Sequence, residues 1–267
     1  MTLKNFLWAC FFAFCGSAFG ANFSSASSSS GETAHFNAQE IIGFAKKVER
    51  RMAENGARVA LLARMGRAKA EMPPGMQFTH VGFAVYSEIQ TADGRKLTGY
   101  AIHNLYQRDK QPQKSELIQD YPVDFFSGVA QLEAAILIPS VELQDRLIKL
   151  IASPDYKSLH DPRYSLIANP YTEGRQNCTE FTLDVINAAI YQTNNVKKLK
   201  QIAKEFFVAQ SVEVNPFKVL LGSVFVPEIS TVDQPGNPVT ATFERIAEYV
   251  LKYDANSKVL KVLPSDL

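Results

Sequence analysis

Hydrophobic and polar residues alternate most regularly over residues 77–90, and this period of two predicts a β-strand. An Asp-Gly pair at residues 93–94 predicts a turn, and residues 97–106 predict the returning strand of a β-hairpin. Side chains alternate between the two faces of a sheet, and the two strands of a hairpin lie side by side. We therefore expect His80 and His103 to face the same way.

Apolar residues at helical spacing predict helices in the rest of the chain, and short apolar runs predict further strands. The expected helices cover residues 38–55, 140–152, 178–191, 197–207 and 242–253. Expected strands cover 133–138 and 219–226, while 58–65 is a strand or a helical continuation, 121–126 a packed loop or short helix, and 164–169 a strand or extended segment. This order favours an α+β fold, with an antiparallel sheet packed against helices, over a parallel βαβ series.

The start of the chain is typical of a secretory signal peptide over residues 1–20. A positively charged start precedes an apolar run over 6–15, and small residues stand before the expected cleavage point. This run is too short to span a bilayer, which needs about 20 residues. Residues 21–34 are rich in serine and predict a flexible linker, and 35–267 a single domain. We expect a periplasmic or secreted protein without stable membrane insertion after cleavage, of open oligomeric state.

The charges of the chain are balanced, with 28 Lys and Arg against 27 Asp and Glu, and basic residues form no stripe. This argues against nucleic acid as a partner. Of the three cysteines, Cys10 and Cys15 fall in the signal peptide, so Cys178 alone enters an oxidising compartment. An intramolecular disulfide is thereby excluded in the mature chain. Three roles stay open: a reactive thiol, an interchain bridge or an inert buried residue.

Cys178 stands in the first turn of the helix expected over 178–191, after the capping pattern of Asn177 and Glu180. The free N–H groups and the dipole of a helix N-terminus stabilise negative charge, which lowers the pKa of a thiol. The position therefore favours the reactive role. Gln176 and Asn177 are candidates to stabilise an oxyanion together with the Cys178 N–H, although Asn177 could equally be a simple helix cap.

A cysteine hydrolase also needs an imidazole that carries the proton and a polar group that orients this imidazole. Of the four histidines, only His80 and His103 lie in clearly predicted strands. Gly82 and Ala84 follow His80 on the same face and leave room for a helix terminus or a substrate, so Cys178 is expected to approach from that side. One cysteine with scattered histidines fits no zinc site, and we predict neither a metal nor a cofactor.

Two short segments carry a resemblance to a known superfamily. Residues 79–83, Thr-His-Val-Gly-Phe, and residues 177–181, Asn-Cys-Thr-Glu-Phe, resemble the circularly permuted branch of the papain-like NlpC-type cysteine hydrolases, whose relatives include lecithin:retinol acyltransferase. In that branch a His-Val-Gly strand precedes the helix that begins with the catalytic cysteine. More narrowly, residues 103–105, 164–170 and 176–178 resemble an exported proteobacterial family known only as domain of unknown function 2145.

The resemblance implies a circularly permuted papain-like fold with Cys178 as nucleophile, His80 as base and His103 as orienting residue. Asn104 takes the orienting role if the strand register differs by one residue. We accordingly expect a periplasmic cysteine hydrolase or acyltransferase that cleaves an amide or ester through a thioacyl intermediate. A cell-wall peptide is the favoured substrate and a lipid acyl group the second. The alternative is a non-catalytic exported binding protein on the same scaffold.

Overall fold

The computed structural model describes residues 35–91, 93–212 and 229–265. Its helices are α1 (Ala38–Glu54), α2 (Pro122–Phe126), α3 (Val141–Ile151), α4 (Pro154–Ser158), α5 (Cys178–Tyr191), α6 (Val196–Phe206) and α8 (Phe243–Tyr253), with a 3-10 turn, η1, at Lys69–Glu71. Its strands are β1 (Val59–Met65), β2 (His80–Gln90), β3 (Lys96–Arg108), β4 (Gln111–Asp120), β5 (Gln131–Ile138), β6 (Gln210–Ser211), β7 (Val239–Thr240) and β8 (Lys258–Val262). The strand expected over 219–226 lies outside the described residues.

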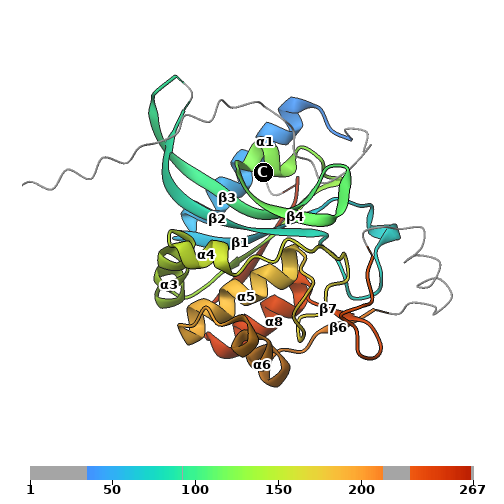
Figure 1. Cartoon of the computed structure of the whole chain (residues 1–267). Helices are drawn as coiled ribbons and strands as arrows, with labels where there is room; N and C mark the ends of the chain where they lie inside the picture. Colours follow the sequence, from blue (N-terminus) through green and yellow to red (C-terminus); the bar gives the residue numbers. More distant parts are fainter. Residues whose placement is uncertain (1–34, 92, 213–228, 266–267) are drawn as a thin grey trace, which may run out of the picture.

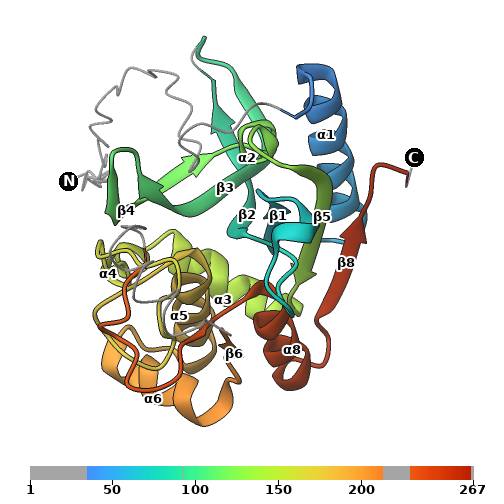
Figure 2. The same cartoon turned by 90° about the vertical axis from the view of Figure 1, so that its right-hand side faces the viewer.

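A six-stranded sheet in the order β4-β3-β2-β1-β5-β8 forms the centre of the molecule, and every neighbouring pair is antiparallel. Figure 1 shows α1 on one side of this sheet and α3, α5, α6 and α8 on the other. Figure 2 shows α2 on the same side as α1. The expected α+β class with an antiparallel sheet and a β2–β3 hairpin is confirmed.

Each face of the sheet has its own apolar core because successive side chains of a strand point to opposite faces. Val81 and Phe83 of β2 pack toward α5, whereas Ala84 packs toward α1. The central strand β1 is buried at all of its positions, so its sequence shows no alternation. The missing alternation explains why the sequence pattern of residues 58–65 fits either a strand or a helix. The structure shows a strand there.

The two edge strands of the sheet, β4 and β8, were not predicted from the sequence. Both carry mostly polar or exposed residues, and neither shows the clean alternation of β2. Edge strands of this kind are common because charged side chains protect the open edge from pairing with other chains. Their positions depend on pairing with β3 and β5, which is a tertiary property.

Helix α5 lies at the centre of the helical layer, between the sheet and the helices α6 and α8 (Figure 1). Nearly all of its residues are buried, including polar ones such as Glu180 and Asp184. The helix begins at Cys178 and is capped by Asn177. The fold therefore delivers the cysteine to the sheet at the end of a helix that is held on all sides.

Candidate functional site

Cys178 is the first residue of α5 and is 9 % exposed, with a free thiol. The Asn177 side chain accepts a hydrogen bond from the N–H of Glu180 at 2.9 Å, as the capping pattern predicts. The reciprocal half of the capping box is not formed. The Glu180 carboxylate instead forms an ion pair with Lys200 of α6.

The surroundings of Cys178 shift the pKa of its thiol in opposite directions. Burial, the largest of them, raises the pKa of the thiol above its ordinary value. Hydrogen bonding to the N–H groups of Val81 and Thr179 and the positive charge of Arg64 lower it. The helix terminus thus acts in the predicted direction, but burial outweighs it, and the thiol is protonated at neutral pH.

The imidazole of His80, at the start of β2, is buried in a polar and aromatic setting. Its Nε2 atom lies 3.1 Å from Asn104 Oδ1, and its ring stacks on Tyr106 with centroids 4.6 Å apart. Burial, and then the charge of Arg64, lower the pKa of His80 to about 3, against the smaller effect of the Asn104 hydrogen bond. The ring is therefore neutral across the physiological range.

Gly82 and Asn104 explain how this geometry is possible. The two residues are paired across β2 and β3, and a Cβ atom at Gly82 would overlap the Asn104 carboxamide. Gly82 therefore makes room for the Asn104 side chain. The sequence-based expectation had assigned this space to a helix terminus or a substrate.

Asn104 is the residue that hydrogen-bonds His80, and the expectation that His80 and His103 face the same way is wrong. His103 pairs with Phe83, whose side chain belongs to the core on the α5 side. Its ring lies edge-on to Tyr156 with centroids 6.1 Å apart, and burial lowers its pKa. The register differs from the expected one by the single residue that the sequence had left open.

A carboxylate that sequence reasoning missed completes the hydrogen-bond chain behind His80. Asn104 Nδ2 donates to Asp120 Oδ1 at 2.8 Å, and the Tyr106 hydroxyl donates to Asp120 Oδ2 at 2.9 Å. Burial raises the pKa of Asp120 to about 7, and the hydrogen bonds from Tyr106 and Asn104 only partly offset it. Asp120 ends the edge strand β4, which had no predictive pattern.

Arg64 is a second residue that sequence reasoning missed. The sequence could have indicated it, because it is the only charged side chain in the apolar run of β1. It pairs with His80 across β1 and β2, and its guanidinium lies 5.4 Å from the centre of the Phe125 ring. Its Nε atom is buried without a hydrogen-bond partner among the residues that the structure describes. A buried cation thus stands beside the histidine and influences both His80 and Cys178.

The side chains of Cys178 and His80 belong to different faces of the sheet, yet the sulfur interacts electrostatically with Arg64 and Tyr106, which both lie beside His80. Cys178 belongs to the core on the α5 side, whereas His80 shares the α1 side with Asn104 by strand alternation. Their link is Val81, the residue after His80, whose N–H bonds the sulfur. Across the described ranges, no hydrogen bond joins the sulfur to an imidazole.

Gln176 and Asn177, the candidates for oxyanion stabilisation, already use their amide groups in structural hydrogen bonds. Gln176 accepts from the Asp161 N–H at 2.9 Å and donates to the Leu159 carbonyl at 3.1 Å. Asn177 donates to the Leu166 carbonyl at 2.9 Å in addition to capping α5. The donors at the sulfur are the N–H groups of Val81 in β2 and of Cys178 and Thr179 in the first turn of α5.

A cavity of about 240 Å³ opens on Cys178. Its lining is mostly apolar and comes largely from the segment before β2, the segment before α5 and residues 240–242 before α8. Its apolar contributors include Met72, Pro73, Met76, Phe78, Leu166 and Ile167. Among the described residues that line it, Arg67 is the one that is charged. The thiol thus has access to a cavity that suits an apolar group.

The described part of the chain contains neither a metal-binding cluster nor a long apolar helix. No group of three or more His, Cys, Asp or Glu side chains is arranged to hold a metal ion there. None of the helices in that part has both the length and the apolar character that crossing a bilayer requires.

The fold and the site together define an α+β protein with a cysteine at a helix start and a buried His-Asn-Asp hydrogen-bond chain on the adjoining strands. A family model described as an uncharacterized protein conserved in bacteria (DUF2145) matches residues 51–250, and the chain belongs to this family. The family expected from the sequence is thereby confirmed. Neither a curated protein nor a solved structure matches the chain.

Proposed function

We propose that the protein is a cysteine hydrolase or acyltransferase of the circularly permuted papain-like, NlpC-type class, exported to the periplasm. The observation that carries this proposal is the placement of Cys178. Its sulfur lies at the amino end of α5, bonds the N–H that follows His80, and opens on an apolar cavity. The leader-like residues 1–20 support export.

The hydrogen bonds of Asn104 define which nitrogen of His80 acts as the base. Asn104 Nδ2 donates to Asp120 and to the Ile102 carbonyl, so Asn104 Oδ1 is the acceptor toward His80. His80 Nε2 therefore carries the ring proton, and Nδ1 is the basic nitrogen. Asp120 and Tyr106 hold the asparagine in this orientation.

The proposed reaction starts from a neutral thiol and a neutral imidazole, as the pKa directions of both groups require. The Cys178 sulfur attacks the carbonyl carbon of an amide or ester while His80 Nδ1 takes the thiol proton. His80 returns this proton to the leaving amine or alcohol as the carbon–heteroatom bond breaks. Water or an acceptor alcohol or amine then cleaves the thioacyl bond and restores the thiol. Backbone N–H groups of the first turn of α5 stabilise the oxyanion.

The substrate class follows from the cavity at the thiol. Its apolar lining suits an acyl group with hydrocarbon character, which is found in a lipid acyl chain and in an apolar peptide side chain. A cell-wall peptide is the substrate that superfamily analogy favours, and analogy is a weak ground for chemistry. The cavity therefore supports the lipid acyl substrate more directly.

The decisive experiment measures acylation of Cys178 by p-nitrophenyl esters of short and medium chain length. We expect a burst of p-nitrophenol and a mass increase on Cys178, both lost in Cys178→Ala. His80→Ala should slow acylation about a hundredfold or more, since general base catalysis contributes roughly that factor. His103→Ala is the matched control, because this histidine lies on the neighbouring strand but on the other face. Equal acylation rates in the two histidine variants would disprove the proposed role of His80.

Two observations favour a second candidate function, a non-catalytic binding protein that uses the same cavity. Burial holds the thiol protonated and no hydrogen bond within the described residues joins it to an imidazole. In that case Cys178→Ser leaves the cellular role intact, and no ester acylates the wild-type protein. Acylation of Cys178 that depends on His80 excludes this alternative.

A further inference from the structure

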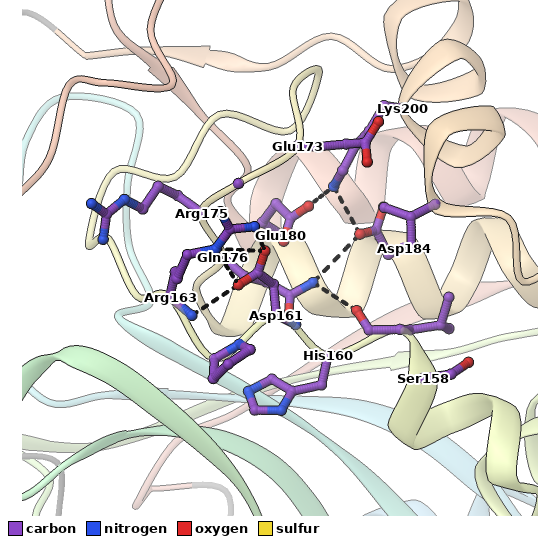
Figure 3. Close-up of a pocket in the computed structure, with 14 residues that line it drawn as sticks. Ser158, His160, Asp161, Arg163, Glu173, Arg175, Gln176, Glu180, Asp184 and Lys200 are labelled. Carbon is purple, nitrogen blue, oxygen red and sulfur yellow. Dashed lines mark hydrogen bonds and ion pairs between the residues drawn. The ribbon is translucent and has the colours of Figure 1, made fainter.

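A second cavity, of about 430 Å³, lies between α5, α6 and the segments 158–163 and 173–176 (Figure 3). It shares no lining residue with the cavity at Cys178. Its charged lining residues are four carboxylates and three cations, namely Asp161, Glu173, Glu180 and Asp184 against Arg163, Arg175 and Lys200. By residue type, carboxylates therefore outnumber cations by one among the described lining residues.

Three of these charged side chains are almost completely buried. Lys200 is 7 % exposed, and Glu180 and Asp184 are 1 % exposed. The Lys200 ammonium forms ion pairs with both carboxylates and lies 2.7 Å from Asp184 Oδ2, and Figure 3 shows it between them. Burial raises the pKa of Asp184 well above its ordinary value, and burial lowers the pKa of Lys200 to about 7.

Among the buried carboxylates of this cavity, Glu180 is the one whose oxygens lack a hydrogen-bond donor in the described residues. Asp161 is satisfied by Arg163, whose guanidinium donates to both of its carboxylate oxygens. Asp184 receives the Lys200 ammonium and a hydrogen bond from Gln176. Glu180 Oε1 has only the ion pair with Lys200, and Oε2 has no partner among the residues that the structure describes. A buried carboxylate oxygen without a donor is strongly unfavourable.

We propose that this cavity binds a small organic monocation whose primary ammonium group occupies the place beside Glu180 Oε2. An ammonium supplies a hydrogen-bond donor for the free oxygen and a positive charge beside the Glu180 carboxylate. A bare metal ion fits less well, because no cluster of three metal ligands occurs in the described residues and the cavity has the volume of an organic ligand. The proposal is independent of the chemistry at Cys178.

The proposal is tested by titrating the mature chain with ethylammonium chloride and following amide resonances by NMR. We expect saturable shifts centred on residues 173–184 and 196–200 at millimolar concentrations. Tetramethylammonium chloride, which has the charge but no N–H donor, and sodium chloride at equal ionic strength should give no saturable shift there. Absence of saturation by ethylammonium, or equal binding of tetramethylammonium, would overturn the proposal.

Variants of the lining residues test whether ethylammonium binds in this cavity. Glu180→Gln keeps the shape and removes the charge, and the affinity for ethylammonium should fall about tenfold or more. Ser158→Trp, at an exposed lining position, should block the cavity and serves if Glu180→Gln does not fold. Ser127→Trp is its matched control, since both serines are exposed and both donate to the carbonyl three residues earlier. Unchanged affinity in Ser158→Trp would overturn the proposal, as would an equal loss in Ser127→Trp.

Discussion

The Asn104 carboxamide occupies the space directly above Gly82, its partner across β2 and β3. This close packing brings Asn104 Oδ1 to 3.1 Å from His80 Nε2 on the same face of the sheet. The glycine two residues after the histidine is thus part of the arrangement that orients the imidazole. A backbone position without a side chain is here a requirement of the candidate site.

Gly82→Ala should therefore disturb both stability and the orientation of His80. The new methyl group must displace Asn104, and we expect the free energy of unfolding to fall by about 1–3 kcal/mol. Urea unfolding measures this loss, and ester acylation of Cys178 should slow in parallel. Gly99→Ala is the control within the same hairpin, because a Cβ there meets only the flexible end of Ile89 at 3.3 Å. Equal losses in both variants would contradict the proposed role of Gly82.

His80 should make the protein sensitive to acid. Its pKa is about 3 in the folded state and 6.5 in the unfolded chain, so the unfolded state binds the extra proton between these values. The stability that the neutral ring contributes is present above pH 6.5 and is lost as the pH falls, by at most about 1.4 kcal/mol per pH unit. Urea unfolding at several pH values should show a smaller loss on acidification for His80→Gln. A parallel pH dependence in both proteins would refute this assignment.

Asp120 should act on stability in the opposite direction. Burial raises its folded pKa to about 7 from 3.8, so between these values the folded state holds the proton and the unfolded state does not. The stability from this protonated carboxyl is complete below pH 3.8 and is lost as the pH rises to about 7. Asp120→Asn should remove this loss, and the difference in unfolding free energy between variant and wild type should grow in its favour from pH 4 to pH 7. A difference that does not change with pH would show that Asp120 does not titrate in this range.

The Asn177 cap of α5 should contribute more to the free energy of unfolding than an ordinary helix cap. Asn195 caps α6 through the Lys198 N–H at 3.0 Å in an exposed position, and Asn195→Ala should lower the free energy of unfolding by about 1 kcal/mol. Asn177 is buried and also donates to the Leu166 carbonyl. Asn177→Ala should therefore lower the free energy of unfolding by about 1–3 kcal/mol more than Asn195→Ala does. Urea unfolding of both variants makes the comparison, and equal losses would contradict it. Because the cap sits beside Cys178, thiol labelling should change only in Asn177→Ala.

Local sequence patterns predicted most of the elements that position the candidate site. The alternation over residues 77–90 corresponds to β2, and the capping pattern at Asn177 corresponds to the start of α5. These predictions succeed because side-chain period and helix capping depend on neighbours a few residues away. The edge strands β4 and β8 lack such a pattern, and Asp120 was missed with β4.

The sequence alone determined that Cys178 begins a helix and that His80 lies in a strand of a hairpin, since both follow from local spacing and chain order. Only the tertiary structure decided that Asn104, rather than His103, bonds the imidazole, because strand register is set by pairing between distant segments. It also decided the protonation of the site. Burial governs the pKa values of Cys178 and His80, and burial exists only once the sheet and the helices have packed together.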